Sequence, residues 1–466
     1  MSWSLLEELR HRPDSIRRML QARGYDVALV DEFASLDQEW KRVKAEVDEL
    51  RHRHNVLTRE VSKAPPEKRA ELIGEAKRLL EEIGRGEEKL KELENKRTLL
   101  LGRLPNLIHD SVYEACRAGA ESTPIHYHGR PRVWREYVDQ FKEKYGGVDH
   151  EVIDWKPVGH ADLLENVLGL GDTQKAGEVA GSRFYYVFDD VVWLDFALIL
   201  YALDFLSRKG FQLVVPPYML KHEVISSVID LEAFKDSIYK IEDEDLYLIG
   251  TAEHPIAAYL RNRELLESDL PILMAGFSPA FRREAGAVNR DLKGIFRVHQ
   301  FHKVEQFVFS LPEESWKWHE ALLGNAREIW EGLEIPFRVV LVCPGDMGRA
   351  AAKQYDLEAW MPAQGTYREM VSCSNVLDWQ SAKLGIRVLR KGMNREYVHT
   401  LNSTAIASTR AITAILENNQ QPDGSVVIPR VLRKYLEPFQ AAPKDVIRPR
   451  RGKEGQSSSS PASSIP

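Results

Sequence analysis

The 466-residue sequence contains few cysteines and no long apolar run. Its three cysteines, Cys116, Cys343 and Cys373, stand far apart and form no CxxC pair, so their spacing suggests neither a zinc site nor a disulfide framework. They fit the reducing cytosol. No stretch approaches the roughly 20 apolar residues of a membrane span, and the N-terminus carries acidic residues that argue against a signal peptide. We expect a soluble, cytoplasmic protein without a membrane partner.

An excess of positive charge is also missing. The chain has 64 Lys and Arg against 70 Asp and Glu, a formal net charge of -6. A nucleic-acid partner would therefore have to meet local basic residues rather than a generally basic surface. The hydrophobic content of 43% is sufficient for a large core, and the length allows about two to four domains.

The stretch Phe281–Phe309 predicts an antiparallel hairpin with a long connection. Four residues that break regular structure separate its two apolar halves: Gly286, Asn289, Asp291 and Gly294. Both halves otherwise have the character of interior strands.

Charged and titratable residues crowd this hairpin: Arg282, Glu284, Arg297, His299 and Glu305. Buried charge is costly unless it is paired or meets a ligand. The guanidinium fork of arginine binds carboxylates and phosphates in bidentate fashion. A structural ion-pair network would explain any one of these residues equally well, but the whole set in one hairpin favours a ligand site.

The N-terminal part predicts helices throughout. Residues 1–28 suggest short helices, and two heptad series follow over 29–61 and 72–104. Joined by a short turn, these helices predict an antiparallel coiled-coil arm about 50 Å long that projects from the body. The second seam is weaker because it contains Gly86 and Arg97, and we expect Gly84 and Gly86 to bend this helix.

The arm has two possible uses. Coiled coils of this kind more often serve dimerisation or act as spacers, and acidic and basic residues nearly balance along both helices. The basic stretch from Arg51 to Lys63, toward the tip, is the best local indication of RNA binding.

Four later segments combine apolar runs with chemically useful residues. A buried helix over Val191–Ser207 leads to a strand over Phe211–Pro217, which its two prolines place at a sheet edge. In Tyr247–Pro255, Thr251 and Glu253 would be ordinary helix-capping residues. The strand around Glu369 and Ser372 supplies oxygen atoms suited to Mg²⁺. In the last segment, Arg410 stands at the start of a helix, where a positive charge is unfavourable unless it is solvated or meets an anion.

These segments resemble, in order, the motifs of the seryl-tRNA synthetases, which are class II aminoacyl-tRNA synthetases. FRREAG and RVHQFHKVE in the hairpin resemble motif 2, the segment 191–217 resembles motif 1, and Leu401–Arg410 resembles motif 3. TAE at 251–253 and YREMVSCSN at 367–375 match two further family patterns. The class I signatures HIGH and KMSKS and a Walker loop are absent, so a Rossmann or P-loop nucleotide site is not expected.

The resemblance implies an α+β protein with three parts. Residues 1–113 would form a helical tRNA-binding domain whose coiled-coil arm covers about 29–104. Residues 114–442 would form a class II catalytic domain built on an antiparallel sheet flanked by helices. The Pro-, Lys-, Arg- and Ser-rich tail at 443–466 is expected to be disordered. Residues 131–180 look like an insertion whose role the sequence does not reveal.

The resemblance also implies the site. Serine would be bound by Thr251, Ala252, Glu253, Arg282, Glu305, Asn402 and Thr404. ATP would be bound by Arg282, Arg283, Glu284, Arg297, Val298, Phe301, Glu369, Met370, Val371, Ser372 and Arg410, with Mg²⁺ on Glu369 and Ser372. Val371 replaces a serine of the family pattern, so the metal role is carried over to those two residues only. Zinc is not expected, because the sequence resembles the common zinc-free form.

The implied reaction is ATP-dependent activation of L-serine, followed by transfer to the 3′ end of tRNA(Ser), and of tRNA(Sec) where it is present. The implied partners are tRNA, gripped by the arm, and a second copy of the chain at 191–217. One alternative is a paralogue that serves another acceptor, but such relatives lack the arm. The other is a non-enzymatic coiled-coil adaptor with a decayed synthetase body. The retention of the full set of site residues argues against it: Arg282, Glu284, Glu305, Glu369 and Arg410.

Overall fold

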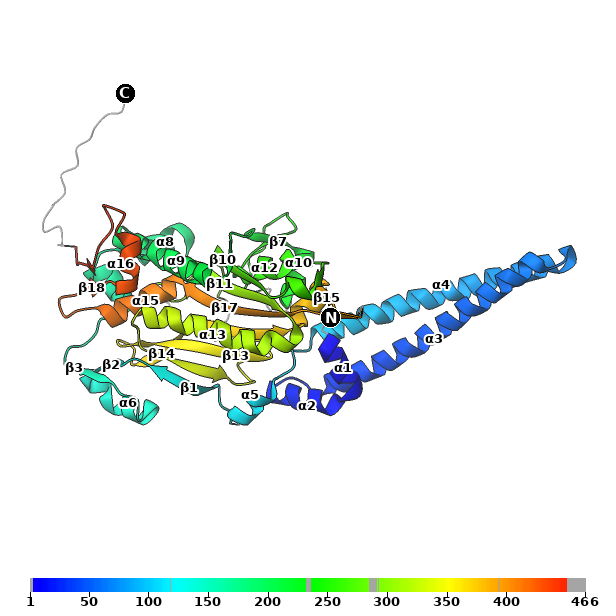
Figure 1. Ribbon diagram of the computed structural model, residues 1–466, viewed down its shortest axis with the longest axis horizontal. Helices are drawn as coiled ribbons and strands as arrows, with labels where there is room; N and C mark the ends of the chain where they lie inside the picture. The colour runs from blue at the N-terminus through cyan, green and yellow to red at the C-terminus, as the bar shows by residue number, and fades with distance from the viewer. Residues whose placement is uncertain are drawn as a thin grey trace, which may run out of the picture.

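The computed structural model describes residues 3–117, 119–231, 236–284, 291, 293–392 and 394–450. A long helical hairpin projects from one end of a body built on a large sheet (Figure 1). Within the described residues, no helix is both long and apolar enough to cross a membrane. The breakers Gly286 and Asn289 and the tail beyond residue 450 lie outside the described part.

The arm consists of α3 (Ala28–Lys63) and α4 (Pro66–Gly102), which confirms the predicted antiparallel pair. Prolines at the start of α4 end one helix and begin the next, because proline fits only the first helical turn. The short helices α1 (Trp3–His11) and α2 (Pro13–Ala22) pack against the root of the arm. Apolar residues from all four helices form a separate small core there. The arm is therefore anchored at its root and free along most of its length.

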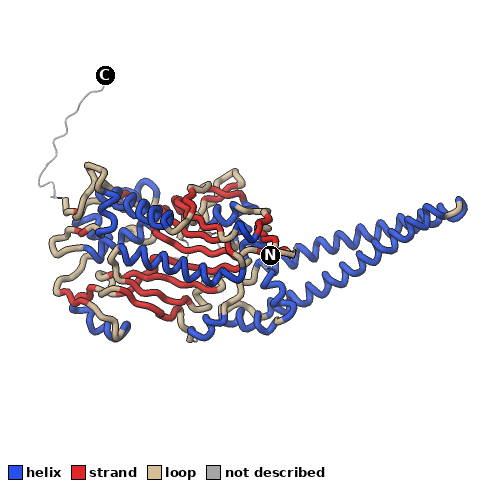
Figure 2. The backbone as a smooth tube through the Cα atoms, in the orientation of Figure 1, coloured by secondary structure: helices blue, strands red, loops and turns tan. Residues whose placement is uncertain are grey.

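The body contains one eight-stranded sheet (Figure 2). In spatial order its strands are β1 (Ser122–His128), β12 (Phe337–Val342), β13 (Lys353–Met361), β14 (Thr366–Leu377), β17 (His399–Ala407), β11 (Gln300–Ser310), β10 (Ile272–Phe281) and β6 (Gln212–Val214). All neighbours are antiparallel except β6 and β10. β6 lies at the edge, as its following prolines predicted. The predicted hairpin is confirmed as β10 and β11.

Side chains alternate along a strand, so the two faces of the sheet pack against different elements. On β11, Val304 and Val308 face the main core under α9 (Asp190–Arg208), α13 (Ser315–Gly332) and α15 (Ser408–Asn419). Figure 1 shows α13 lying across this face. The alternate residues of β11 face the opposite side, where α12 (Glu253–Tyr259) packs. The candidate site lies on this second face.

Smaller elements complete the body. The remaining helices are α5 (Asp110–Ala115), α6 (Val138–Tyr145), α7 (His160–Asp162), α8 (Thr173–Ala180), α10 (His222–Val228), α14 (Trp379–Leu384) and α16 (Arg430–Leu436), with the short helices η1 (Arg135–Tyr137), η2 (Leu163–Val167), η3 (Glu267–Asp269) and η4 (Pro312–Glu314). Short strands form β2 (Arg132–Trp134) with β3 (Glu151–Ile153), β4 (Gly171–Asp172) with β5 (Tyr186–Val187), and β7 (Met219–Lys221) with β8 (Leu246–Leu248). β9 (Glu264–Leu266), β15 (Arg387–Leu389) and β16 (Arg395–Tyr397) form a further sheet, and β18 (Val426–Val427) pairs with β19 (Val446–Ile447).

The insertion-like segment is part of the body's packing. Around β2, β3 and α6, Val133, Phe141 and Tyr145 join Trp360 and Tyr367 in an aromatic cluster at the end of β13 and β14. Downstream, η2 joins the main core through Leu163 and Leu164, and α7 packs against α15. The segment therefore covers one end of the sheet.

Three expectations from the sequence require correction. Cys116 and Cys343 form a disulfide, although their separation of 227 residues gave no local pattern. The first residues of the segment expected to be disordered are instead packed on the body, because β19 pairs with β18 and Ile447 is fully buried. The helix expected to be buried, α9, leaves Phe196 and Leu200 exposed on one side.

Candidate active site

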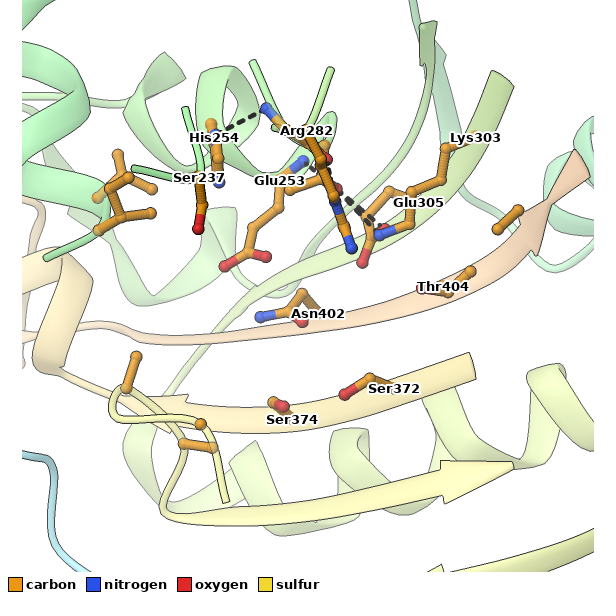
Figure 3. Close-up of a pocket in the computed structure, with 18 of the residues that line it drawn as sticks. Ser237, Glu253, His254, Arg282, Lys303, Glu305, Ser372, Ser374, Asn402 and Thr404 are labelled. Carbon is orange, nitrogen blue, oxygen red and sulfur yellow. Dashed lines mark hydrogen bonds and ion pairs between the residues drawn. The ribbon is translucent and has the colours of Figure 1, made fainter. Parts of the chain in front are cut away.

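A cavity of about 690 Å³ opens on the α12 face of the sheet. A volume of this size suits a small-molecule ligand. The register explains why its polar side chains gather: Glu305 on β11 lies opposite Thr404 on β17, and Asn402 on β17 lies opposite Ser374 on β14. Figure 3 shows Glu253, Arg282 and Glu305 on one side of this space and Asn402, Thr404 and Ser372 on the other.

A glycine brings α12 close to the sheet. A Cβ on Gly276 of β10 would lie 2.5 Å from Ile256 Cδ1 and 2.7 Å from Ala252 Cβ, so only glycine fits without movement. Because Gly276 pairs with Glu305, this close approach places the start of α12 beside the Glu305 carboxylate. Packing thus positions Thr251 and Glu253 in the cavity.

Glu305 has fixed partners. It is only 1% exposed and forms an ion pair with Lys303, which lies two residues earlier on the same face. The Thr251 hydroxyl donates to Glu305 Oε2 at 3.2 Å, and Lys303 Nζ donates to Thr251 Oγ1 at 3.1 Å. A buried carboxylate with a paired charge and a hydroxyl neighbour can receive a hydrogen bond from a ligand.

Glu253 lies in a different electrostatic setting. Burial, helped by the nearby negative charge of Glu305, raises the pKa of its carboxyl to about 7. Its neighbour His254 is buried beside Arg282, and burial together with that positive charge lowers the His254 pKa to about 3. His254 is therefore neutral at physiological pH, and its Nδ1 accepts from the Gly250 amide at 3.4 Å.

Arginines surround the other end of the cavity. Arg282 Nε donates to the Gly250 carbonyl at 3.2 Å. Burial and the nearby charge of Arg410 lower the pKa of Arg282. Arg410 forms an ion pair with Glu369 at 3.1 Å, and this charge holds the pKa of Glu369 below its usual value. Arg297 pairs with Glu284 at 3.1 Å.

Two phenylalanines provide flat apolar surfaces among these cations. The Arg282 guanidinium lies 5.4 Å from the centre of the Phe301 ring, and those of Arg368 and Arg410 lie 4.3 and 5.3 Å from the Phe296 ring. Cation–π contact of this kind stabilises arginines that are withdrawn from water. Phe296 is buried in the main core, whereas Phe301 lines the cavity. A flat ring beside arginines and acids can bind an aromatic base with attached phosphates.

Most residues predicted from the sequence line this cavity: Thr251, Glu253, Arg282, Glu284, Arg297, Phe301, Glu305, Glu369, Met370, Ser372, Asn402, Thr404 and Arg410. Four do not line it, namely Ala252, Arg283, Val298 and Val371. Ala252, Val298 and Val371 are buried in the cores, and the Arg283 amide bonds to the Ser237 carbonyl. Any contact of the three core residues with a ligand would have to come from their backbone.

Sequence reasoning missed several lining residues. Lys303 could have been found, because it shares the strand face of Glu305 by simple alternation. His254 and Gln380 carry no such signal, since their place in the cavity depends on how α12 and α14 pack. Arg349, from the loop between β12 and β13, lines it as well.

That loop, residues 343–352, also contacts the root of the arm. The buried Arg23, which follows α2, donates to the carbonyls of Met347, Gly348 and Ala351. Arg349 donates to the Arg103 carbonyl at 2.7 Å, just beyond α4, and forms an ion pair with Asp230 at the cavity wall. One short loop thus contacts both the arm root and the cavity.

Comparison with known proteins gives consistent results. Residues 6–108 match the family model for the seryl-tRNA synthetase N-terminal domain, and residues 238–419 match that for the class II tRNA synthetase core domain of the G, H, P, S and T type. A serine–tRNA ligase of Hyperthermus butylicus is 61% identical over 96% of this chain and 99% of its own length.

Solved structures agree with the sequence comparisons. Seryl-tRNA synthetase from Pyrococcus horikoshii, complexed with ATP, has a TM-score of 0.90 and 48% identity over 96% of this chain and 99% of that one. The cytoplasmic serine–tRNA ligase of Naegleria fowleri, in complex with AMP, has a TM-score of 0.79 and 33% identity over 94% and 96% of the two chains.

Proposed function

The chain belongs to the seryl-tRNA synthetases, and on that premise we propose how its cavity carries out the reaction of the family. The activity is ATP-dependent ligation of serine to tRNA. The observation that supports our assignment of roles is that Arg282, Glu305 and the Arg410–Glu369 pair line one cavity. These are the residues that a carboxylate, a hydroxyl and a nucleotide phosphate would respectively require.

The first step forms seryl-adenylate. The serine carboxylate attacks the α-phosphorus of ATP, and pyrophosphate leaves. In our assignment Arg282 holds the carboxylate and α-phosphate, while Arg297 and Arg410 contact the γ-phosphate. Glu284 receives the adenine amino group, and the adenine stacks between Phe301 and Arg410. Positioning and charge neutralisation would supply most of the acceleration.

The second step transfers the serine. The terminal hydroxyl of tRNA attacks the carbonyl carbon of the adenylate, the ester bond forms as the bond to AMP breaks, and the hydroxyl proton passes to the phosphate of the leaving AMP or to water. Within the described residues we assign no general base to this step.

Selection of serine depends on the opposite end of the cavity. Glu305 and Thr404 would bind the serine hydroxyl, Thr251 and Glu253 its ammonium group, and Asn402 faces the same pocket. A site built around a hydroxyl rejects alanine, because its buried polar groups would lose their partner. Threonine would be excluded only by lack of room for its methyl group, which is a weaker device.

Magnesium would be held by Glu369 and Ser372. Within the described residues, no cluster of three or more His, Cys, Asp or Glu side chains could hold a metal ion. One carboxylate and one hydroxyl nevertheless fit Mg²⁺, which keeps several waters and usually takes few protein ligands besides phosphates. The ion would neutralise phosphate charge.

We further propose that the arm binds tRNA(Ser), and tRNA(Sec) where present, and that two chains pair through Val191–Pro217. The matched N-terminal family model supports the first proposal, and the exposed apolar residues of α9 support the second. We also propose a cytoplasmic location, which the substrates of the family support. The Cys116–Cys343 disulfide would then be an exception to the rule that cytosolic cysteines stay reduced.

Serine-dependent ATP–pyrophosphate exchange tests the function, with threonine, alanine and proline as competing amino acids. We expect exchange with serine and at most about 1% of that rate with alanine, which lacks the hydroxyl. Equal exchange with alanine would contradict the roles given to Glu305 and Thr404. Absence of exchange with every amino acid would leave only the adaptor hypothesis.

A further inference from the structure

The buried side-chain amide of Gln380 contacts the Glu253 carboxylate. Gln380 lies on α14 and is only 1% exposed. Its Nε2 donates to Glu253 Oε1 at 2.8 Å, and its Oε1 accepts from the Thr400 hydroxyl at 2.8 Å. Thr400, on β17, is itself fully buried. The three side chains therefore form a short relay that runs from the sheet to the cavity wall.

The direction of this relay is fixed by hydrogen-bond chemistry. An amide has one end that donates and one that accepts. Because the ionised Glu253 carboxylate can only accept, the amino end of Gln380 faces Glu253, and the Gln380 oxygen then accepts from the Thr400 hydroxyl. A neutral N–H donor stabilises a charged carboxylate oxygen and leaves the second oxygen of Glu253 open to a ligand.

Within the described residues, Gln380 is the one side chain that forms a direct hydrogen bond with the Glu253 carboxylate. No ion pair there includes Glu253, although Lys303 and Arg282 lie near enough to favour its charge and Glu305 opposes it. A buried carboxylate with so little support is close to the point at which it takes up a proton. Its orientation and charge therefore depend on Gln380.

We propose that Gln380, held in place by Thr400, is a positioning residue that keeps one oxygen of Glu253 occupied so that the other meets the ammonium group of the amino acid. This inference rests on the proposed role of Glu253 as the ammonium ligand. Neither Gln380 nor Thr400 needs to touch the substrate. Their effect passes through the carboxylate alone.

The test replaces Gln380 and follows the pH dependence of serine binding. In the full-length Gln380→Leu protein, we expect the KM for serine in pyrophosphate exchange to rise about tenfold or more at pH 7.5, the usual size of the loss when a hydrogen bond to a charged group is removed. The KM for ATP should change less than twofold. Since Gln380 lowers the Glu253 pKa, the pH at which serine binding weakens should move upward.

Thr400 offers a second, milder route to the same relay. Thr400→Val removes the hydroxyl that orients Gln380 and should raise the serine KM by a smaller factor, with the same upward shift of the pH profile. Thr400→Ser keeps the hydroxyl and should restore the normal profile. If Gln380→Leu fails to fold, this pair still decides the question: an unchanged profile in a folded Thr400→Val protein would overturn the inference.

Ser381 supplies a matched control. It is the next residue on α14 and is fully buried, and its hydroxyl faces the Val398 and Asp378 carbonyls rather than the cavity. Ser381→Ala should lower the melting temperature and leave the serine KM and its pH profile unchanged. If Gln380→Leu behaves like Ser381→Ala, Gln380 is structural only.

Glu253→Gln distinguishes the proposed role of Glu253 as ammonium ligand from the positioning role of Gln380. A normal serine KM in this variant would reject Glu253 as the ammonium ligand, and the role of Gln380 would fall with it. A raised KM in Glu253→Gln, with none in Gln380→Leu, would reject the positioning role alone.

Discussion

At the scale of single residues, the Arg282 side chain is fixed by protein contacts on one side and faces the cavity on the other. Its Nε bonds to the Gly250 carbonyl, and its guanidinium lies over Phe301. Within the described residues its two terminal nitrogens make no hydrogen bond to protein, so both are available to one ligand. This is the geometry that bidentate binding of a carboxylate or phosphate requires.

We predict that Arg282→Ala abolishes pyrophosphate exchange, with a loss of at least about 100-fold, because charge stabilisation in the transition state is removed. Arg282→Lys should also lose most activity, since an ammonium group cannot replace the fork. Thermal unfolding would serve as the control for folding. Exchange at the wild-type rate by a folded Arg282→Ala protein would remove this residue from the mechanism.

How far the sequence predicts the site depends on the source of each contact. Glu305 could be singled out from the residues alone, as a charge in an otherwise apolar strand, whereas Thr404 and Asn402 were expected only from the family resemblance; the strand register brings all three together. Gln380 was not, because its place depends on α14 packing against α12 and β17, which no local spacing encodes. The disulfide was missed for the same reason, since only the folded chain brings Cys116 and Cys343 together.

At the scale of elements, the polar interruption in the arm's second heptad series has a structural explanation. Arg97 lies over the Trp40 ring at 4.2 Å and forms an ion pair with Asp37 at 2.7 Å. Arg10 of α1 and Lys41 also pair with Asp37. This buried network fastens α1, α3 and α4 together at the arm root.

We predict that Asp37→Asn destabilises the arm root by about 3 kcal/mol, because Arg97 would stay buried without its counter-charge. Burial raises the Asp37 pKa, but the bonds from Arg10 and Lys41 and the charge of Arg97 outweigh it, so the pKa is lowered overall. A lowered carboxylate pKa contributes stability above its unfolded value, about 3.9, and this contribution is lost as the pH falls further.

Thermal unfolding between pH 3 and pH 7 would check this prediction. Wild-type protein should lose stability below about pH 4, and the Asp37→Asn variant should show less of that loss. Asp48→Asn is the matched control, since Asp48 pairs with Lys44 on the exposed surface of the same helix. This substitution should change the stability far less than Asp37→Asn does.

Gly86 shows a limit of pattern-based prediction. We expected Gly84 and Gly86 to bend the second arm helix; α4 is continuous through both residues, and the bend itself stays a prediction. A Cβ on Gly86 would lie 2.6 Å from Val47 Cγ2 on α3. The sequence marked the position correctly, while its role as a close contact between the helices appears only when both helices are in place.

At the scale of the whole molecule, we expect the body to activate serine and the arm to bind tRNA. The arm can be shortened without disturbing its root, since the apolar residues that anchor it lie below Leu36 on α3 and above residue 99 on α4. We predict that replacing residues 51–85 with a short Gly-Ser turn preserves serine-dependent exchange and lowers tRNA charging about 100-fold or more, because several phosphate contacts are lost. Charging at the normal rate would assign tRNA binding to another surface.

The proposed dimer face can be tested separately. On α9 and beyond β6, Leu200 and Val215 are 43% and 66% exposed. We predict that Leu200→Glu combined with Val215→Glu yields a monomer by sedimentation, because two charges per chain would have to be buried in the interface. Leu99→Glu, at an exposed apolar position on the arm, should leave the assembly state unchanged. An unaltered assembly in both would place the interface elsewhere.

The disulfide between Cys116 and Cys343 has a topological consequence. It closes residues 117–342 into a covalent ring that includes α9 and the β10–β11 hairpin. The arm lies in the N-terminal segment outside the ring, and β17 lies in the C-terminal segment outside it. A single protease cut inside the ring therefore releases no fragment on a denaturing gel until a thiol reagent is added. A single cut in the arm separates two pieces at once.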